Sequence, residues 1–230
     1  MAIGLAEAGA DIILLDRSPS SETRDRIEEL GRKCTCLKVD LLHLGAVDAR
    51  QIVKNCVEEM GGVDILVNNA GIIKRGKAEE FSEEAWQQVL DVNLNSVFFL
   101  SQAMAAYAIK GNRPGKIINM ASMLSFQGGL TVPSYTASKS AIAGLTKALA
   151  NEWASKGIHV NAIAPGYLRT EVTVGIYSDP KRNHSILERI PADRWGEPED
   201  LKGIVVFLAS DASSYVHGAV IPVDGGWLAR

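Results

Sequence analysis

Two residues near the middle of the chain have the types and the spacing that proton transfer to an oxygen requires. Tyr135 and Lys139 are four residues apart, so their side chains lie on one face of a helix, one turn apart. A free tyrosine has a pKa near ~10, which is too high for a general base at neutral pH. A neighbouring ammonium stabilises the phenolate and lowers that pKa. The pair therefore predicts a tyrosine that exchanges a proton with a substrate oxygen.

A serine precedes this pair in the sequence and could act with it. Ser122 follows the predicted strand Lys116–Met120. Open α/β sheets bind ligands at the carboxyl ends of their strands, where a hydroxyl can hold the substrate oxygen while Tyr135 moves the proton. The alternative is a surface Tyr–Lys pair beside an unrelated loop serine. The offset of Ser122 and its place at a strand end favour the catalytic interpretation.

Small and polar residues mark the same edge of the predicted sheet. The segment Asn68-Asn69-Ala70-Gly71 ends a strand with small residues, as a close approach of backbone to ligand requires, although an ordinary strand-to-loop turn has the same composition. Asn93 lies among apolar helix residues and needs buried partners, either as a structural cap or to hold a water next to Lys139. Pro165-Gly166 supplies a rigid turn after another strand.

Apolar strands alternate with helices along the whole chain. This order predicts a doubly wound parallel sheet of the Rossmann type, covered by helices on both faces, in one domain over residues 1–230. The predicted strands are Asp11–Asp16, Thr35–Val39, Asp64–Val67, Lys116–Met120, His159–Ile163 and Ala219–Val223. The predicted helices are Met1–Ala8, Ser20–Gly31, Ala46–Met60, Glu83–Tyr107, Ser134–Lys156 and Asp200–Ala209, with Ile27 and Leu30 on the inner face of the second.

Composition excludes several classes of protein. Of 230 residues, 47% are apolar and 22% are charged, and the net charge is −3 without a basic tract, so we expect no nucleic-acid partner. No apolar run reaches the ~18–20 residues of a membrane span, and no cationic leader precedes the first helix. The pair Cys34-x-Cys36 has no second ligand pair, and we expect reduced thiols, no metal and a cytoplasmic location.

Taken together, the motifs resemble those of the classical short-chain dehydrogenase/reductase family. The matching residues are the Asn-Asn-Ala-Gly segment, Asn93, Ser122, Tyr135-Thr-Ala-Ser-Lys139 and Pro165-Gly166. The resemblance implies an oxidoreductase in which Tyr135 is the acid/base and Ser122 orients the carbonyl or alcohol. It also implies that Lys139 binds the nicotinamide ribose and lowers the tyrosine pKa, while Asn93 holds a proton-relay water.

The cofactor expected from this resemblance is NAD. Asp16 ends a strand where a carboxylate accepts hydrogen bonds from the adenosine ribose and repels a 2′-phosphate, although the adjacent Arg17 could bind a phosphate and Asp16 could be a turn residue. Asp40 and Leu41 match the adenine-contacting position. The cofactor-binding residues that the resemblance implies are Asp16, Asp40, Leu41, Asn68, Ala70, Gly71, Tyr135, Lys139, Pro165, Gly166 and Thr170.

Within the family, segments around Ser122, Trp195 and the C-terminus resemble enzymes that act on deoxy-hexonate sugar acids, such as 2-dehydro-3-deoxy-D-gluconate. Gluconate 5-dehydrogenases are the neighbouring alternative. An anionic substrate calls for cations in the pocket, so Arg75 and Arg194 are candidate substrate residues, although each could be a solvated surface charge. Gln127 is a further candidate substrate residue. The segment from Tyr167 to Ile190 resembles the family's mobile lid, and the C-terminal Gly225–Leu228 resembles segments that pack between subunits of a homotetramer.

One element of the family pattern is absent from the sequence. The family opens with a strand and a T-G-x3-G-x-G turn, and Met1 falls just inside the helix that follows, so roughly 20 residues are missing by comparison. The missing strand would be central, and its burial would contribute on the order of 10 kcal/mol, comparable to a whole domain's ~5–15 kcal/mol. We therefore expect weak dinucleotide binding and marginal stability. The chain is either a shortened copy of an oxidoreductase or a non-catalytic interaction subunit.

Overall fold

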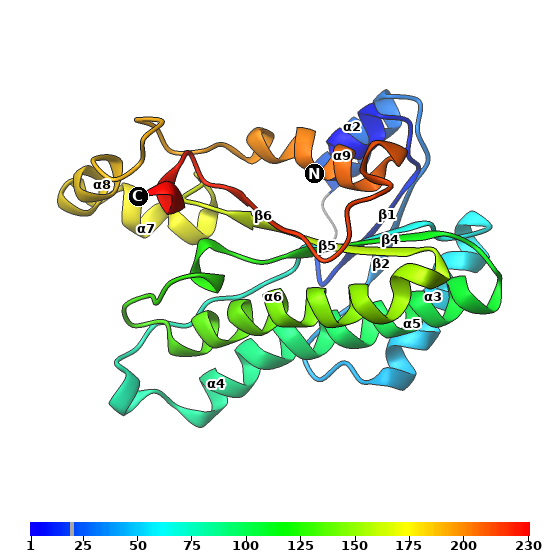
Figure 1. Ribbon diagram of the computed structural model, residues 1–230, viewed down its shortest axis with the longest axis horizontal. Coiled ribbons are helices and arrows are strands. Elements are labelled where there is room, and N and C mark those ends of the chain that lie inside the picture. The colour runs from blue at the N-terminus through cyan, green and yellow to red at the C-terminus, as the bar shows by residue number, and fades with distance from the viewer. Residues whose placement is uncertain (19–20) are drawn as a thin grey trace.

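A computed structural model describes residues 1–18 and 21–230, and it contains a parallel sheet between two layers of helices (Figure 1). The strands are β1 (Ile12–Asp16), β2 (Cys34–Lys38), β3 (Ile65–Asn68), β4 (Gly115–Met120), β5 (Ile158–Pro165) and β6 (Val220–Val223). The helices are α1 (Ala2–Glu7), α2 (Ser21–Glu29), α3 (Ala46–Met60), α4 (Glu83–Leu90), α5 (Ser96–Lys110), α6 (Pro133–Trp153), α7 (Val174–Tyr177), α8 (Pro180–Leu187) and α9 (Lys202–Ala209). The predicted doubly wound α/β fold is confirmed.

The helices divide between the two faces of the sheet. In Figure 1, α3, α4, α5 and α6 lie below the sheet, while α1, α2 and α9 lie above it. The small helices α7 and α8 lie at the left end, near the C-terminus, and project beyond the strands. All observed strand pairs are parallel, as crossovers through helices require.

The sheet is divided into two parts. One part has the order β3-β4-β5-β6, and the other contains β1 and β2. Among the described residues no strand lies between β1 and β3, and both of these strands line a single cavity of about 960 Å³. The gap lies where the resemblance to the short-chain dehydrogenase/reductase family implies a further central strand.

Burial along the strands reflects this gap. The central strands β4 and β5 are buried at nearly every position, and Ile158, Val160 and Ile163 are fully inaccessible. In β3, by contrast, Ile65, Leu66 and Val67 are only partly buried, and all three line the cavity. Apolar side chains on the two strands that flank the gap therefore lack part of the packing that stabilises a central strand.

A chain of buried amides joins β3, β4 and α6. The Nδ2 of Asn68 donates to Asn119 Oδ1 at 2.9 Å and to Ser101 Oγ at 3.1 Å. The Nδ2 of Asn119 in turn donates to Thr146 Oγ1 at 3.0 Å. All four residues are buried, so each bond satisfies a group that would otherwise cost about 1–3 kcal/mol. This network fixes the ends of β3 and β4 against α6, which carries Tyr135 and Lys139.

Most predicted elements agree with the structure, and the differences have local causes. The helix Ala46–Met60 is confirmed at both ends, with Gly61 in the left-handed conformation that ends it. The prediction of Leu30 on the inner face of α2 is wrong: α2 ends at Glu29 and Leu30 is 45% exposed, whereas Ile27 is buried. The predicted start at Ser20 lies outside the described residues.

The predicted helix Glu83–Tyr107 is longer and is interrupted. A π-helical turn over Asp91–Asn95 separates α4 from α5. The whole run Glu83–Lys110 is the single helix in the described ranges that is long and apolar enough to cross a membrane by length and composition, a property that the sequence analysis did not expect. Half of its most apolar window is buried in the protein, and Asn93 and Ser96 are hydrogen-bonded inside, so its composition is that of a core helix.

Because of the gap, we expect two valines, Val160 and Val67, to contribute differently to the free energy of unfolding. Val160→Ala, in the packed β5, should lower the free energy of unfolding by about 2 kcal/mol, because it removes fully buried methyl groups. Val67→Ala, beside the gap, should cost under about 1 kcal/mol, because its surroundings are incompletely packed. Urea unfolding of both variants measures the difference. Equal costs would show that the gap is filled in solution.

Candidate active site

The site is built at the carboxyl end of β4, where a lysine is buried. Lys139 is 4% exposed, and its Nζ donates to the backbone oxygen of Met120 at 2.6 Å. Burial lowers the pKa of this ammonium to about 8, because removal from water disfavours the charged form. The Nζ lies 5.6 Å from the centre of the Tyr135 ring, as the spacing of the two residues predicts. The sequence therefore places Tyr135 and Lys139 together correctly.

Ser122 is held by a turn that begins at its own position. It caps the 3₁₀ turn Met123–Ser125: its Oγ accepts from Leu124 N at 3.1 Å, while its backbone N donates to Ser125 Oγ at 3.3 Å. The Ser125 hydroxyl donates to Lys139 O at 2.6 Å, which ties this turn to α6. Ser122 is 7% exposed and faces the Tyr135 phenol, with which its hydroxyl interacts.

The phenol of Tyr135 is subject to opposing influences. Burial raises its pKa above the ordinary value, and the interactions with Ser122 and with the Arg75 charge lower it. The net shift of the Tyr135 pKa is upward, so the expected lowering by Lys139 is not the dominant effect in this structure. Burial disfavours the charged form of both groups, the phenolate of Tyr135 and the ammonium of Lys139.

Asn93 takes part in a bridge between two elements. Its Nδ2 donates to Ile72 O at 2.9 Å and to Ser138 Oγ at 3.2 Å, and its Oδ1 accepts from Ile72 N at 2.8 Å. The side chain thus joins the loop after β3 to α6 from within the π-helical turn, a feature that often occurs at functional sites. The side-chain polar atoms are all engaged by protein, and a water-holding role for Asn93 stays a prediction.

The predicted cofactor residues follow one edge of the sheet. Six predicted cofactor contacts are among the residues that line the cavity between β1 and β3, together with the neighbouring Asn69: Asp16, Leu41, Asn68, Ala70, Pro165 and Thr170. Gly71 follows Ala70 in the chain, and a Cβ at Gly71 would meet Asn93 Oδ1 at 3.5 Å and Lys139 Nζ at 3.7 Å. This cradle beside a buried cation fits a ribose with its hydroxyl groups, so the residues present fit the nicotinamide end of a dinucleotide.

Other predicted cofactor residues have structural partners. Gly166 is packed against the backbone of Asp224, since a Cβ there would lie 2.6 Å from Asp224 Cα. Asn68 belongs to the buried amide network, and Asp40 accepts from Leu42 N at 3.0 Å. Asp16 is exposed and accepts from Ser18 N at 2.8 Å, which leaves its carboxylate at the end of β1 facing the cavity. These contacts are compatible with a dinucleotide lying along the edge.

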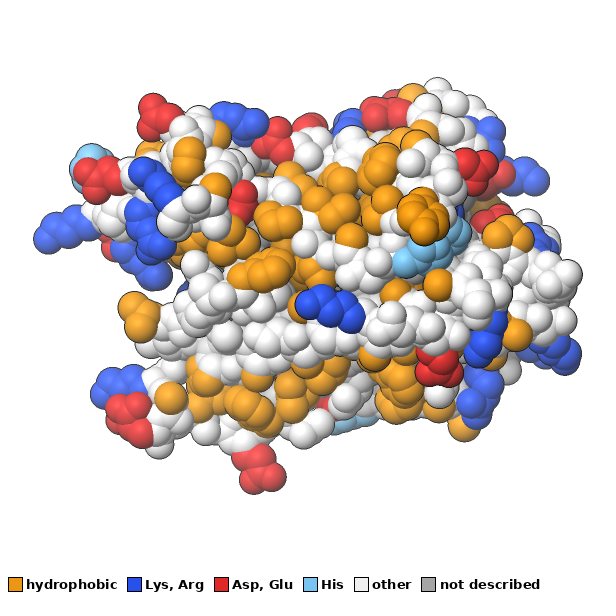
Figure 2. Space-filling view, viewed as in Figure 1, with side chains coloured by type: hydrophobic (Ala, Val, Ile, Leu, Met, Phe, Trp, Pro, Cys, Tyr) orange, Lys and Arg blue, Asp and Glu red, His pale blue; other side chains and the backbone are white. Residues whose placement is uncertain are grey.

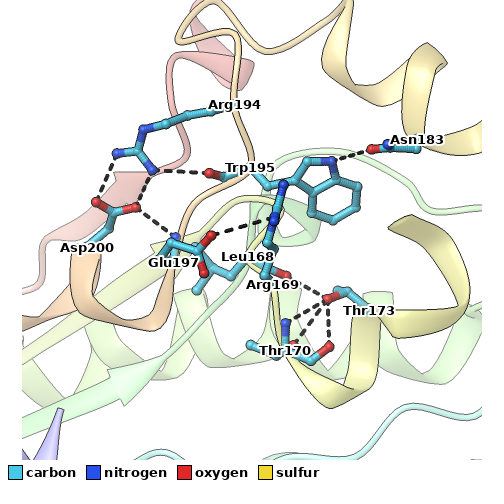
Figure 3. A network of polar contacts seen from close by, with 9 residues as sticks. All are labelled: Leu168, Arg169, Thr170, Thr173, Asn183, Arg194, Trp195, Glu197 and Asp200. Atoms are coloured by element: carbon cyan, nitrogen blue, oxygen red, sulfur yellow. Dashed lines mark hydrogen bonds and ion pairs between the residues drawn. The ribbon is translucent and has the colours of Figure 1, made fainter. Parts of the chain in front are cut away.

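The predicted substrate residues separate into different environments. Arg194 forms a bidentate pair with Asp200, at 2.7 and 2.9 Å, and also donates to Trp195 O (Figure 3). This pairing holds the pKa of Asp200 at about 2 and engages both terminal nitrogens of the guanidinium. Gln127 Oε1 accepts from Trp227 Nε1 at 3.2 Å. Arg75 is exposed beside the site, where its charge acts on Tyr135.

An aromatic wall next to Ser122 was not expected from the sequence. Tyr167, Trp195 and Trp227 meet edge to face, and they belong to a cluster that includes Met123 and the lid residues Ile176, Ile186 and Ile190. The segment predicted to be a lid contains α7, α8 and the turn Glu171–Thr173, in which Thr173 Oγ1 donates to Leu168 O (Figure 3). The signal that could have identified the wall is the presence of three aromatic residues in segments rich in glycine and proline.

The remaining cysteines and histidines lie outside this arrangement. Burial and the neighbouring Cys36 raise the pKa of Cys34 to about 11, so the thiol stays protonated at neutral pH and is a weak nucleophile. In the ranges 1–18 and 21–230 no group of three or more His, Cys, Asp or Glu side chains could hold a metal ion.

Comparison with known proteins defines the class. A family model described as Enoyl-(Acyl carrier protein) reductase matches residues 1–228. A 2-dehydro-3-deoxy-D-gluconate 5-dehydrogenase of Dickeya dadantii is 55% identical over 230 residues, which are 100% of this chain and 90% of the relative. The chain belongs to the short-chain dehydrogenase/reductase family, and is thus an oxidoreductase that acts on CH–OH groups with a nicotinamide cofactor.

Solved structures agree with this assignment. A protein from Agrobacterium tumefaciens, provisionally named 2-deoxy-d-gluconate 3-dehydrogenase and solved with NADP, is 52% identical with a TM-score of 0.91. The alignment covers 100% of this chain and 90% of that one. A gluconate 5-dehydrogenase from Burkholderia cenocepacia in complex with NADP and tartrate is 37% identical with a TM-score of 0.91, covering 100% of this chain and 89% of that one.

The buried lysine predicts a particular dependence of stability on pH. Above pH 8 the folded protein releases the Lys139 proton while the unfolded chain keeps it up to about 10.5, so the unfolded state binds more protons and the folded state gains stability as pH rises. Between pH 7 and 9.5 the gain should be about 2 kcal/mol, at ~1.4 kcal/mol per pH unit above 8.

Lys139→Met should remove this gain and raise the stability at pH 7, since no charge is then buried. Denaturant unfolding at pH 7 and 9.5 tests both points, with Lys147→Met, exposed on the same helix, as the control. An unchanged pH dependence in Lys139→Met would refute the assignment.

Proposed function

We propose that this protein transfers hydride between NAD(H) and a hydroxyl or ketone carbon of a deoxy-hexonate sugar acid, such as 2-dehydro-3-deoxy-D-gluconate. The observation that carries the proposal is the Tyr135 phenol beside Ser122 and Lys139, next to the Arg75 charge. A cation near the acid/base suits an anionic substrate. The names of the relatives from Dickeya dadantii and Agrobacterium tumefaciens support the same class. A gluconate 5-dehydrogenase activity is the alternative, supported by the relative from Burkholderia cenocepacia.

The residues divide the reaction between them. Ser122 hydrogen-bonds the substrate oxygen and holds it next to the tyrosine, from a turn that its own cap keeps rigid. Tyr135 gives its proton to that oxygen in reduction and takes it back in oxidation. Lys139 holds the ribose hydroxyls beside Gly71 and places a cation under the phenol. The nicotinamide, when bound, supplies or accepts the hydride.

The proposed cofactor preference is NAD over NADP. It rests on Asp16, an exposed carboxylate at the end of β1 that lines the cavity, because a second negative charge there repels a 2′-phosphate. Arg17 is adjacent, and three of the related structures contain NADP. The balance between Asp16 and Arg17 therefore decides the preference.

We also propose a cytoplasmic homotetramer. Figure 2 shows hydrophobic side chains exposed over α9, and Phe207 and Tyr215, 36% and 98% exposed, lie on or next to that helix. Exposed aromatic residues of this kind are typical of subunit contacts. The C-terminal Trp227–Ala229 turn lies at the end of the chain, near the lid.

Predicted cofactor residues from both halves of the sheet line the cavity between β1 and β3. Titration of NADH into the folded chain tests whether these residues bind a dinucleotide. Saturable binding supports the proposal, and no binding contradicts it.

Tyr135→Phe tests the acid/base role. Turnover of a deoxy-hexonate should fall by about 10²–10⁴-fold, because the phenol that interacts with Ser122 is the proposed source of the proton. The dissociation constant of NADH should stay unchanged. Steady-state kinetics and fluorescence titration measure the two quantities, and turnover near the wild-type value would remove Tyr135 from the mechanism.

Asp16→Asn tests the cofactor preference. The ratio of the NADPH to the NADH dissociation constant should fall about tenfold or more, since tenfold corresponds to ~1.4 kcal/mol and the repulsion of a 2′-phosphate is lost. Glu59→Gln, exposed on α3, removes the same charge elsewhere and should leave the ratio unchanged. A ratio that does not move in Asp16→Asn would assign the preference to other residues.

A further inference from the structure

Two hydrogen bonds join the segment around Ser122 to α6, one on each side of the serine. Two residues before Ser122, the backbone oxygen of Met120 accepts from Lys139 Nζ at 2.6 Å. Three residues after it, the hydroxyl of Ser125 donates to the backbone oxygen of Lys139, also at 2.6 Å. Lys139 is therefore bonded through its ammonium and through its own carbonyl to the segment that carries Ser122.

The side chain of Ser125 contacts Ser122 as well as α6. The backbone N of Ser122 donates to Ser125 Oγ at 3.3 Å, and Ser125 N donates back to Ser122 O at 2.9 Å. The hydroxyl of Ser125 has a single proton, which it donates to Lys139 O, so that it acts as an acceptor toward Ser122 N. One half-buried side chain thus connects the backbone of Ser122 directly to the backbone of Lys139.

The same turn sets the direction in which the Ser122 hydroxyl can act. Its Oγ accepts from Leu124 N at 3.1 Å, so one lone pair is occupied and the hydroxyl proton is available for donation. Burial raises the pKa of Tyr135, and the interaction with the Ser122 hydroxyl lowers it in part. A donor at this place stabilises the phenolate, so the ionisation of Tyr135 depends on where the turn holds Ser122.

We infer that Ser125 is a positioning residue for proton transfer, which fixes Ser122 relative to the Tyr135 phenol by joining the turn to α6. This inference rests on the proposed function, because it concerns the acid/base chemistry of the same site. A misplacement of reacting groups by about 1 Å can lower a rate by about 10²-fold. A residue that acts through its neighbours can therefore control turnover.

A second serine provides a matched comparison. Ser140, exposed on α6, donates from its hydroxyl to Leu124 O at 3.4 Å. It joins the same turn to the same helix, but its bond is to Leu124 and not to the backbone of Ser122. Removal of either hydroxyl loosens the attachment of the turn, and removal of the Ser125 hydroxyl also releases Ser122 N. The two substitutions therefore separate positioning of Ser122 from general stabilisation.

Steady-state kinetics of the full chain with a deoxy-hexonate test the role of Ser125. In Ser125→Ala, kcat should fall about tenfold or more, while KM for the hexonate stays within about twofold, because the loss affects the transition state and not substrate binding. Ser125→Thr keeps a hydroxyl and should restore most of kcat. Ser140→Ala should turn over as the wild type does. A kcat in Ser125→Ala equal to that of the wild type, or an equal loss in Ser140→Ala, would overturn the inference.

The pH dependence of alcohol oxidation gives a readout that a merely structural role would not change. The phenolate of Tyr135 is the base in this direction, so the rate rises with pH through the pKa of Tyr135. In Ser125→Ala the midpoint of this rise should move to higher pH by about 0.5, since a displaced Ser122 stabilises the phenolate less. Ser140→Ala should keep the wild-type midpoint. An unchanged midpoint in Ser125→Ala would count against the positioning role.

Amide hydrogen exchange, measured by NMR, separates this inference from the proposed function. The exchange of the Ser122 amide should be about tenfold faster or more in Ser125→Ala, because its acceptor is removed, and unchanged in Ser140→Ala. If the wild type turns over no hexonate, the proposed function is refuted, and the exchange result alone decides whether Ser125 holds Ser122. Faster exchange in Ser125→Ala supports the positioning role, and unchanged exchange refutes it, in either case.

Discussion

The burial of one ammonium group organises the active site. Lys139 reaches the end of β4 and donates to Met120 O, and the groups around it leave the side chain only 4% exposed. Ser125 is bonded to the lysine's own backbone oxygen, and Gly71 leaves room beside the Nζ. An isolated buried charge is costly, and the pKa near 8 records that cost. The serine turn, the loop after β3 and α6 are therefore fixed relative to one another.

The same edge of the sheet shows the effect of the divided architecture. β4 and β5 form a packed unit with α5 and α6, which carries Tyr135 and Lys139, while Asp16 at the end of β1 lies across a cavity. The buried amides of Asn68 and Asn119 anchor β3 to the packed unit. The candidate catalytic residues and the predicted adenosine contacts therefore lie on different parts of the sheet.

Two arginines in the region after β5 have different kinds of partner. Arg194 and Asp200 join the segment before Trp195 to the start of the turn before α9, and the exposed pair contributes mainly geometry, since surface ion pairs are weak. Arg189 has an aromatic partner, the Trp227 ring, 4.0 Å from its guanidinium. The first pair orients a loop, and the second contact covers one face of a buried tryptophan.

The sequence by itself determined the local part of this protein. The four-residue step from Tyr135 to Lys139 places both on one helix face whatever surrounds them, and the strand before Ser122 and the helix Ala46–Met60 follow from short-range periodicity and caps. The family's alternation of strands and helices then gave the order of elements. These features depend on residues within a few turns of one another.

The tertiary structure decided the partners of the same residues. Arg194 and Arg75 have the same side chain, and only the position of Asp200 makes one structural while the other stays unpaired. Asn93 is bonded across 45 residues to Ser138, and Trp227 across 100 residues to Gln127. Such contacts depend on how distant segments meet, and neither hydrophobic period nor motif spacing carries that information. The net rise in the Tyr135 pKa is likewise set by burial, which only the folded chain defines.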